Sequence, residues 1–386
     1  MRVDGSDDMK RLAIGIMSGT SMDGIDAALV ELDGSFTNTR LRFLAGRSDP
    51  FSADLVTKLK QCIHPTTSTA ALVCSVHFEL ALAYADTVRH LLADVDLTSN
   101  DIAFVACHGQ TIYHINASRD DLVRSSLQLG DGSVMAQVLG IPTVSNFRNA
   151  DIAHGGTGAP LVPYADFVLF QHDSNTRVLH NIGGISNITI LPARGSLDDV
   201  IAFDTGPGNM MIDDAMRILY GREYDHDGSV AASGIVRDKL LDHILGHPFF
   251  ALEPPKSTGR EQFGIQYTEE LIERFDHLAK EDIIATLTEA AAQSMADALQ
   301  RYAPAVDELI VSGGGAANIH LVSRLQARMP DLTITTTDDH GIPAIYKEAI
   351  AFAVLGNETM QHKPSNVPGA TGASRPVVLG QIAYTK

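Results

Sequence analysis

Three turns in this sequence combine glycine with oxygen-bearing side chains at the ends of apolar runs. They are residues 18–26, 204–209 and 312–318. Glycine lets backbone N–H groups approach a ligand without a Cβ in the way, and successive N–H groups form an anion-binding concavity. A helix that begins after such a turn adds its dipole and its unpaired N–H groups. One turn of this kind is common structural chemistry, but three at strand ends predict a nucleotide-binding protein.

Two aspartates within these turns could assist phosphoryl transfer, which needs Mg²⁺, positioning and a carboxylate that orients or deprotonates the nucleophile. Asp204 follows the apolar run 200–203, so a rigid strand would hold it. A helix predicted to begin near Asn209 could hold a phosphate beside it. The alternatives are an N-cap or Asx-turn role for Asp204 and a tight-hairpin role for Asp23.

The apolar runs around the turns predict an α/β fold. Residues 12–17 and 25–32 predict a β-hairpin, and residues 177–191 predict a second hairpin with glycines in its turn. Segments 200–221 and 308–328 each predict a strand, a glycine turn and a helix. The remaining predicted elements are a strand at 41–51, helices within 68–94, a strand at 102–111, a helix and strand within 134–147, and helices within 268–302 and 346–360.

The repeated hairpin predicts two similar α/β domains that face a cleft, with ligands outside the carboxyl ends of the strands. We place the domain boundary near residues 145–150, which gives an N-terminal domain of 1–147 and a C-terminal domain of 148–386. The ends of the chain could also cross back into the other domain.

The composition limits the class of function. The chain has 386 residues, of which 45% are apolar, and a formal net charge of −18. This charge disfavours nucleic acid and anionic membranes as partners, so a phosphate ligand would need local N–H groups or cations. We find no apolar signal segment and no apolar run near the roughly 18 residues of a membrane span. The three separated cysteines predict free thiols in a reducing cytoplasm.

The three turns, in this order, resemble those of the superfamily of actin, the sugar kinases and the heat-shock ATPases. In that fold the first two turns hold the β- and γ-phosphates of ATP from opposite domains, and the third supports the adenosine. Longer segments are similar to the anhydro-N-acetylmuramic acid kinase family, from residue 12 to about residue 380. These segments are GIMSGTSMDGIDAALVEL, ACHGQTIYH, NFRNADIAHGGTGAPLVPYAD, LHNIGGISNIT, FDTGPGNMMIDDA, PKSTGREQF, VSGGGAANIHL and GIPAIYKEAIAFAVLG.

This resemblance implies two actin-like (ribonuclease H-like) domains and an enzyme that uses ATP, Mg²⁺ and water. Its reaction would convert 1,6-anhydro-N-acetylmuramic acid into N-acetylmuramic acid 6-phosphate and ADP, in peptidoglycan recycling, with domain closure like that of hexokinases. Asp204 would be the catalytic base and Glu348 would contact the sugar. The expected ATP-binding residues are Gly19, Thr20, Ser21, Met22, Asp23, Gly24, Ile25, Asp26, Gly206, Gly208, Asn209, Gly313, Gly314 and Gly315. A homodimer agrees with the family, and the metal ligands stay unidentified because Mg²⁺ often contacts protein through water.

The chemistry requires a base near C1 of the sugar. In the anhydro sugar O6 is bound to C1 as an ether, so no 6-hydroxyl exists to be deprotonated. A carboxylate must therefore activate water, and Asp204 is our candidate.

The remaining candidates would bind the sugar or phosphate. Arg148 could meet the lactyl carboxylate, or it could pair with Asp151 instead. His108, Gln110 and Thr111 end a predicted strand and could bind the sugar or cap the strand. The residues alone would place Glu348 on a solvated helix face. Lys256 and Arg260 lie near a glycine and could contact a ligand or belong to a surface loop.

Two other functions compete with this prediction. A sugar kinase of the same fold could phosphorylate a free hydroxyl, which Asp204 would deprotonate directly. An actin-like or chaperone-like ATPase would hydrolyse ATP without a sugar and would present a surface for a partner protein.

Overall fold

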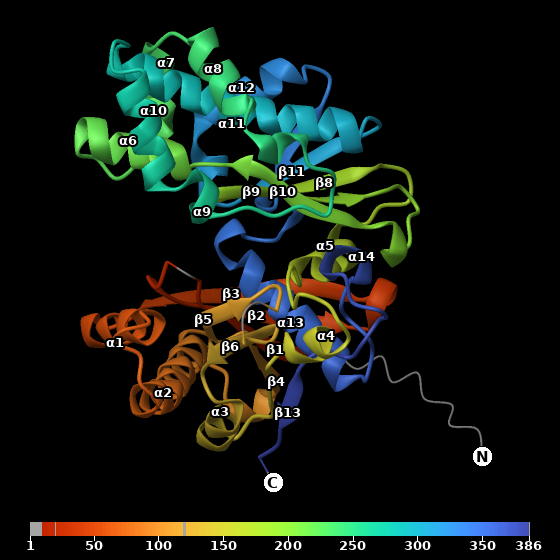
Figure 1. Ribbon diagram of the computed structural model, residues 1–386. Coiled ribbons are helices and arrows are strands. Elements are labelled where there is room, and N and C mark those ends of the chain that lie inside the picture. The colour runs from red at the N-terminus through yellow and green to blue at the C-terminus, as the bar shows by residue number, and fades with distance from the viewer. Residues whose placement is uncertain (1–9, 20, 119–120, 386) are drawn as a thin grey trace. The chain divides into compact units, whose positions relative to one another are not determined.

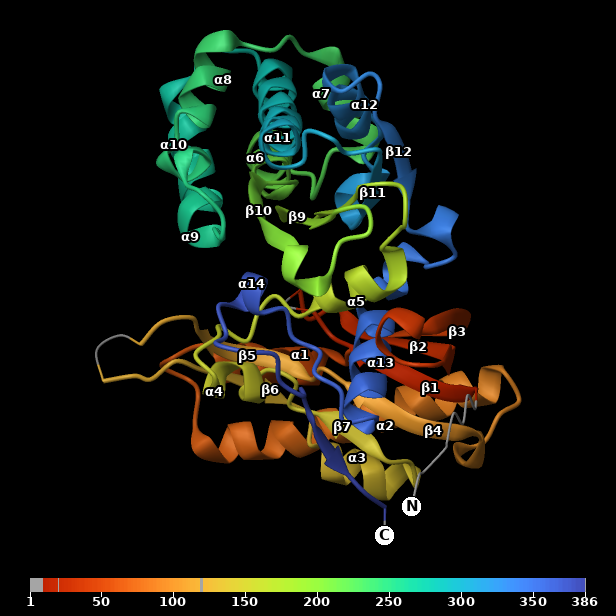
Figure 2. The same cartoon turned by 90° about the vertical axis from the view of Figure 1, so that its right-hand side faces the viewer.

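A computed structural model describes residues 10–19, 21–118 and 121–385, which form two compact units (Figures 1 and 2). Unit 1 comprises Met1–Leu169 and Gly341–Lys386, and unit 2 comprises Phe170–His340. The division thus lies after residue 169, not at the expected boundary of 147, and the C-terminal segment returns to the first unit. The physical reason lies in Asp151, whose Oδ1 accepts hydrogen bonds from Asn366 (2.8 Å) and Thr371 (2.7 Å) of that C-terminal segment.

Unit 1 is built on a sheet of six strands in the order β13-β7-β4-β1-β2-β3, beside a separate ribbon of β5 and β6. Its strands are β1 (Arg11–Met17), β2 (Gly24–Asp33), β3 (Arg40–Pro50), β4 (Ile102–Cys107), β5 (Gln110–Ile115), β6 (Ser125–Leu129), β7 (Thr143–Ser145) and β13 (Gln381–Ala383). Its α-helices are α1 (Ala53–Ile63), α2 (Ala70–Asp94), α3 (Gly132–Leu139), α4 (Asn149–Ala153), α5 (Val162–Phe170, whose last residue opens unit 2), α13 (Lys347–Met360) and α14 (Pro368–Thr371).

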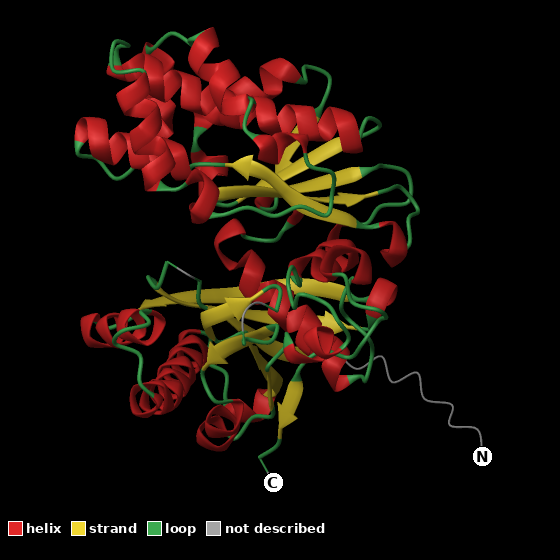
Figure 3. Cartoon of the chain, viewed as in Figure 1, coloured by secondary structure: helices red, strands yellow, loops and turns green. Residues whose placement is uncertain are grey.

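Unit 2 has a sheet of five strands in the order β10-β9-β8-β11-β12, with most of its helices on one side of that sheet (Figure 3). Its strands are β8 (Arg177–Ile182), β9 (Ile185–Leu191), β10 (Ile201–Pro207), β11 (Glu308–Ser312) and β12 (Thr333–Thr336). Its α-helices are α6 (Met210–Tyr220), α7 (Ser229–Ser233), α8 (Asp238–Leu245), α9 (Arg260–Phe263), α10 (Ile265–Arg274), α11 (Lys280–Tyr302) and α12 (Ile319–Arg328).

The two sheets repeat one topology. In unit 1 the first strand pairs antiparallel with the second and parallel with the fourth, β4, which in turn pairs parallel with β7. In unit 2 β8 pairs antiparallel with β9 and parallel with β11, which pairs parallel with β12. In both units the third strand extends the hairpin antiparallel. This duplication confirms the predicted fold of two hairpin-led, actin-like α/β domains.

The sheet of unit 1 lies between α2 and α13, which cover opposite faces (Figure 2). Ile14 and Ile16 point to the face that packs with α2. Gly15, between them, points to α13, and a Cβ on Gly15 would lie 1.8 Å from the carbonyl oxygen of Ala349. The glycine therefore lets the first turns of α13 approach the centre of the sheet.

The α2 helix has enough length and apolar composition to cross a membrane, contrary to the expectation that no such run exists. Its apolar residues include Val76, Leu80, Tyr84 and Val88, which are fully buried in the core of unit 1. Packing against the sheet therefore accounts for the apolar character of these positions.

Candidate functional site

The first glycine turn joins β1 to β2. Met17 and Asp26 are the last paired residues of the two strands before this turn. Met22 adopts a left-handed conformation with φ of 56°, and its N–H donates to the carbonyl oxygen of Gly19 at 3.2 Å. Ser21 donates its hydroxyl to Asp23 at 2.9 Å. Thr20, an expected ATP-binding residue, lies outside the described residues. The turn is thus a short, hydrogen-bonded backbone loop at the ends of two strands.

The two glycines of this turn have different environments. Among the described residues, a Cβ on Gly19 would meet only the hydroxyl of Ser21, at 3.5 Å. A Cβ on Gly24 would lie 2.5 Å from the carbonyl oxygen of Asp49 on the neighbouring strand. Close strand packing therefore requires glycine at position 24, whereas the space at position 19 is open to a ligand.

Two further residues of the first motif lie on β2. Ile25 is buried in the apolar core, so its side chain serves packing. Asp26 is half-buried and accepts a hydrogen bond of 2.5 Å from the hydroxyl of Ser48. Burial raises the pKa of Asp26, the Ser48 bond opposes this effect, and the charge of Asp23 adds to it. The two carboxylates give this end of the hairpin a concentrated negative charge.

Gln110 connects β5 to the first turn. Its side chain is fully buried, and its Nε2 donates to the carbonyl oxygen of Gly19 at 3.0 Å. Its Oε1 has no hydrogen-bond partner within the described parts of the chain. The neighbouring Thr111 accepts a hydrogen bond from Gln128 at 3.1 Å. The geometry therefore gives Gln110 a direct structural link to the turn, in addition to its predicted contact with a ligand.

Arg148 and His108 form a pair inside unit 1. Arg148 donates from Nε (3.2 Å) and from Nη2 (2.8 Å) to Nε2 of His108, and from Nη1 to the carbonyl oxygen of Gly158 (2.6 Å). Burial and the charge of Arg148 lower the pKa of His108 far below its ordinary value, so the ring is neutral and its proton is on Nδ1. Oδ2 of Asp151 accepts the N–H of Gly158 at 2.8 Å, and Asp151 forms no ion pair with Arg148 within the described residues. Burial lowers the pKa of Arg148 to about 10, and the charges of Glu348 and then Asp151 oppose that effect, so Asp151 acts on Arg148 through its charge alone.

Glu348 lies in the first turn of α13, where part of its side chain reaches solvent while its carboxyl group is near the protein groups that shift its pKa. Burial raises the pKa of its carboxyl, Lys347 and then Arg148 oppose that effect, and Asp26 and Asp166 add to it. Glu348 therefore shares one electrostatic environment with Arg148 and Asp26, residues that are far from it in the sequence.

In unit 2, Asp204 lies on β10 just before a register shift against β9. Its backbone N–H donates to the carbonyl oxygen of Lys256 at 3.1 Å, and the N–H of Thr258 donates to its Oδ2 at 2.9 Å. Burial raises the pKa of Asp204 to about 6, the Thr258 bond opposes this effect, and the charge of Glu261 adds to it. A carboxylate with this pKa, held by a strand and a loop, has the properties of a general base near neutral pH.

The turn after Asp204 packs against the β8–β9 hairpin. Gly206 has φ of 142°, and a Cβ there would lie 2.7 Å from the ring of Phe250. A Cβ on Gly208 would lie 2.3 Å from the carbonyl oxygen of Gly183, which also accepts the N–H of Asn209 at 2.8 Å. Gly206 thus makes room for the Phe250 ring, and Gly208 allows close backbone packing directly before α6, whose N-terminus follows at Met210.

The third turn begins at Gly313 (φ of 82°) and continues into the 3₁₀ helix Gly314–Ala317. A Cβ on Gly315 would lie 2.2 Å from Cγ2 of Ile182, whereas one on Gly314 would meet no atom of the described chain within 4 Å. Asn318 caps α12 by accepting the N–H of Leu321 at 3.0 Å. Of these three glycines, Gly314 has the most open surroundings.

Two roles were expected for Lys256 and Arg260, a contact with a ligand or a place in a surface loop. Lys256 lies with its Nζ 4.7 Å from the centre of the Phe249 ring and donates to two backbone carbonyl groups. Arg260 begins α9 on the surface.

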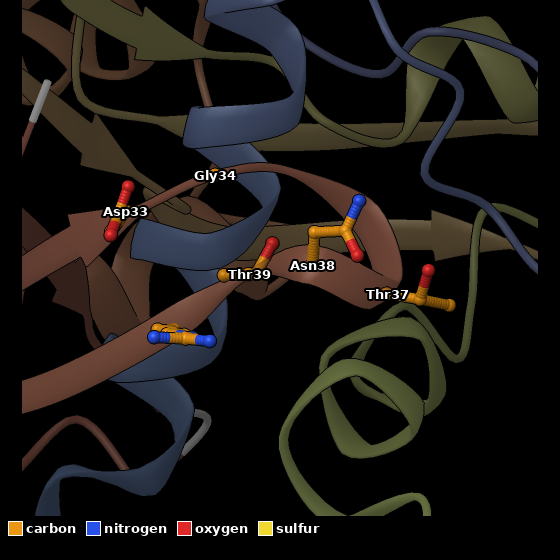
Figure 4. Close-up of a pocket in the computed structure, with 6 residues that line it drawn as sticks. Asp33, Gly34, Thr37, Asn38 and Thr39 are labelled. Carbon is orange, nitrogen blue, oxygen red and sulfur yellow. The ribbon is translucent and has the colours of Figure 1, made fainter. Parts of the chain in front are cut away.

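The pocket in Figure 4 lies in the connection between β2 and β3, beside α13. It contains no expected site residue and is lined by Asp33, Gly34, Thr37, Asn38, Thr39 and Arg40.

The described residues contain no cluster of three or more histidine, cysteine or acidic side chains that could enclose a metal ion. Mg²⁺ in phosphoryl-transfer sites keeps several waters and binds the substrate phosphates. The carboxylates of Asp23 and Asp26 beside the first turn could hydrogen-bond such waters. The open space at Gly19 suits an approaching phosphate, so these residues fit ATP with hydrated Mg²⁺.

Sequence reasoning missed a basic and an acidic residue near Glu348, Lys347 and Asp166. Lys347 and Asp166 form a buried ion pair, with Nζ 3.0 Å from Oδ1. Lys347 stands next to Glu348 in the sequence, which was the one available signal, whereas Asp166 lies on α5 and no sequence pattern links it to α13.

The duplicated α/β topology and a strand-held aspartate followed by a glycine turn define a two-domain α/β protein of the kind that transfers phosphoryl groups. The chain belongs to the family described as anhydro-N-acetylmuramic acid kinase, which matches residues 11–385.

Two similar proteins named anhydro-N-acetylmuramic acid kinase match over almost their whole length. That of Francisella tularensis subsp. novicida is 45% identical over 377 residues, which are 97% of this chain and 99% of the relative. That of Bacillus cereus (strain G9842) is 42% identical over 375 residues, 96% of this chain and 98% of the relative. A solved activator of a 2-hydroxyisocaproyl-CoA dehydratase from Clostridium difficile has 12% identity and a TM-score of 0.46, covering 91% of this chain and 97% of the activator. That structural likeness is too distant to bear on function.

Proposed function

We propose that this protein is a kinase that hydrolyses the 1,6-anhydro ring of 1,6-anhydro-N-acetylmuramic acid and phosphorylates O6. The products are N-acetylmuramic acid 6-phosphate and ADP, and the reaction serves peptidoglycan recycling. Family membership supports the substrate. The structural observation that carries the mechanism is Asp204, a fixed carboxylate whose pKa of about 6 leaves it ionised at neutral pH.

In this mechanism Asp204 accepts a proton from water, and the water oxygen forms a bond to C1. The bond between C1 and O6 breaks, and its electron pair stays on O6. O6 then forms a bond to the γ-phosphorus of ATP, and ADP leaves with the electron pair of the broken P–O bond. Asp23 and Asp26 would hold hydrated Mg²⁺ beside the first turn, and when bound it would neutralise phosphate charge. The proton on Asp204 returns to solvent.

The other expected residues bind and orient the two substrates. The backbone of the turn around Gly19 and the turns at Gly208 and Gly314 contact ATP. Arg148 keeps two of its five N–H donors beyond the bonds to His108 and Gly158, and these recognise the lactyl carboxylate. Glu348 accepts hydrogen bonds from sugar hydroxyl or amide groups.

Three further properties belong to the proposal. Mg²⁺ accompanies ATP, the protein works in the cytoplasm, and it forms a homodimer. The cytoplasm suits the three cysteines, Cys62, Cys74 and Cys107, which are free thiols in the structure.

Turnover in ¹⁸O-labelled water tests the ring-opening step. The hydrolytic kinase requires one labelled oxygen at C1 of the product, whereas a kinase that acts on a free hydroxyl incorporates none. Product incubated alone in the same water measures background exchange at C1. Phosphorylation without label above that background would contradict the mechanism.

A panel of sugars separates the proposal from its other competitor. Anhydro-N-acetylmuramic acid, the anhydro sugar without the lactyl group and free N-acetylmuramic acid are each supplied with ATP and Mg²⁺. We expect ADP release to depend on the first. ATP hydrolysis that no sugar stimulates would instead favour an actin-like or chaperone-like ATPase.

A further inference from the structure

The α13 helix begins with a buried lysine, which is an unfavourable choice for a helix start. The ammonium group of Lys347 lies near the positive end of the helix dipole and is removed from water, a position in which a charged group requires a partner of opposite charge. Its side chain is only 8% exposed. The carboxylate of Asp166 on α5, itself 4% exposed, lies 3.0 Å from Nζ and compensates that charge.

This ion pair joins the first turn of α13 to α5 at the residue next to Glu348. On the opposite side, the close contact between Gly15 and Ala349 fixes the same turn against β1. Four charged groups act on Glu348 from the elements around it: Lys347 on α13, Arg148 before α4, Asp26 on β2 and Asp166 on α5. The pair thus contributes one charge of each sign to the surroundings of Glu348.

We propose that Asp166 and Lys347 are a positioning pair that sets the location and the charge of Glu348 at the sugar site. The assignment of Glu348 to the sugar rests on the proposed function. The charge of Lys347 favours the ionised form of Glu348, and the charge of Asp166 opposes that effect while it holds the lysine in place.

Because Lys347 and Asp166 have opposite charges, removing each of them should shift the pKa of Glu348 in opposite directions, and this distinguishes a positioning role from simple structural support. Loss of Lys347 removes a positive neighbour and should raise the pKa of Glu348. Loss of Asp166 removes a negative neighbour and should lower it. A purely structural pair predicts no such opposition, because removing either partner only leaves an unpaired buried charge or a loosened helix.

The test follows the titration of Glu348 by NMR in protein with ¹³C-labelled glutamate side chains, using Glu348→Gln to assign the signal. We expect Lys347→Met to raise the midpoint by about half a pH unit or more, and Asp166→Asn to lower it by a similar amount. The matched controls are Arg89→Met and Asp86→Asn, which remove the partners of an exposed ion pair on α2. Both controls should leave the midpoint unchanged.

A double variant keeps the test decisive if either single variant fails to fold. Asp166→Leu with Lys347→Met replaces the pair by apolar groups, a change that buried pairs often tolerate. Its Glu348 midpoint should lie close to that of the wild type, because the two removed charges have opposite effects. A large shift in this variant, or single variants that shift the midpoint in the same direction, would overturn the inference.

Kinetics supply the second readout and separate this inference from the proposed function. We expect the midpoint changes to appear in the pH dependence of KM for the sugar, with KM for ATP unchanged. A wild-type protein that never phosphorylates the anhydro sugar would remove the proposed function but leave the NMR result standing. Normal wild-type turnover with unshifted Glu348 titration in every variant would remove only the positioning role.

Discussion

The backbone N–H of Thr258 lies 2.9 Å from Oδ2 of Asp204, and it is the chief group that stabilises the charge of this half-buried carboxylate. Burial has the larger effect, so the pKa rises to about 6 in spite of the bond. The hydrogen bond also fixes the rotation of the carboxyl group. One loop therefore sets both the orientation of the proposed base and the pH range in which it works.

The first prediction is that kcat/KM for the sugar decreases as the pH falls below the pKa of Asp204. A base must be deprotonated, so kcat/KM for the sugar should fall about tenfold per pH unit below a midpoint near pH 6. The profile is measured between about pH 4.5 and 8 at saturating ATP. A profile that stays flat down to about pH 4.5, as expected for a base with the ordinary aspartate pKa of 3.8, would contradict the assignment, provided that circular dichroism shows a folded protein throughout.

The second prediction concerns Asp204→Asn. The variant keeps an acceptor for Thr258 but cannot take a proton, so turnover should fall by about 10²- to 10⁴-fold. ATP affinity, measured by calorimetry, should stay unchanged. Turnover close to that of the wild type would exclude Asp204 as the base.

The same variant has a signed effect on stability. Because folding raises the pKa of Asp204 above the unfolded value, the wild type loses stability as the pH rises through about 4 to 6. The Asn variant lacks that loss. Its Tm should therefore exceed the wild-type Tm at pH 7, and the difference should shrink toward pH 4.

The sequence predicted the elements well because their signals are local. Apolar alternation and glycine turns identified both hairpins. The strand expected before Asp204 begins at the predicted position, but it continues through Asp204 to Pro207, where a turn was predicted. The domain boundary depended instead on contacts between distant segments, such as Asp151 with Thr371. No periodicity in the chain reports such a contact, so the assignment of residues 148–169 to unit 1 required the structure.

In the candidate site, too, the sequence does not report which distant residues come together. Motif resemblance nominated Glu348, and the lactyl carboxylate of the expected substrate nominated Arg148, but their common environment arises from the fold of unit 1. The solvated face that the residues alone suggested for Glu348 agrees with its exposed side chain, whereas the partners that bury the rest of this turn come from β1 and α5 and have no local signal in the sequence. The roles of these residues stay predictions.

The third prediction distinguishes two glycines of the first turn. Gly19→Ala has room for its methyl group and should keep the Tm within about 1–2 °C, while ATP binding weakens because the open approach is narrowed. Gly24→Ala would clash with the carbonyl oxygen of Asp49 and should lower the Tm. Calorimetry with ATP and thermal unfolding give the two readouts. Unchanged ATP affinity in a folded Gly19→Ala variant would count against the phosphate role of the turn.

The fourth prediction concerns the contact between β1 and α13. Gly15→Ala places a Cβ against the carbonyl oxygen of Ala349, so it should destabilise the protein by about 1–3 kcal/mol through overpacking. Because α13 must shift outward, KM for the sugar should rise more than KM for ATP. Denaturant unfolding and kinetics measure both effects. Gly314→Ala, with no atom within 4 Å of its Cβ, is the control for stability, and an equal loss in that variant would refute the packing argument.

The fifth prediction tests which group of the sugar Arg148 recognises. Arg148→Lys keeps the charge but cannot hold Nε2 of His108 from two nitrogens while it contacts a carboxylate. We expect kcat/KM for the lactyl-bearing anhydro sugar to fall by about 10- to 100-fold, consistent with the loss of a charged hydrogen bond. The anhydro sugar without the lactyl group should lose much less, because it offers no carboxylate. Equal losses for both sugars would show that Arg148 supports His108 and the fold of unit 1 and does not read the lactyl group.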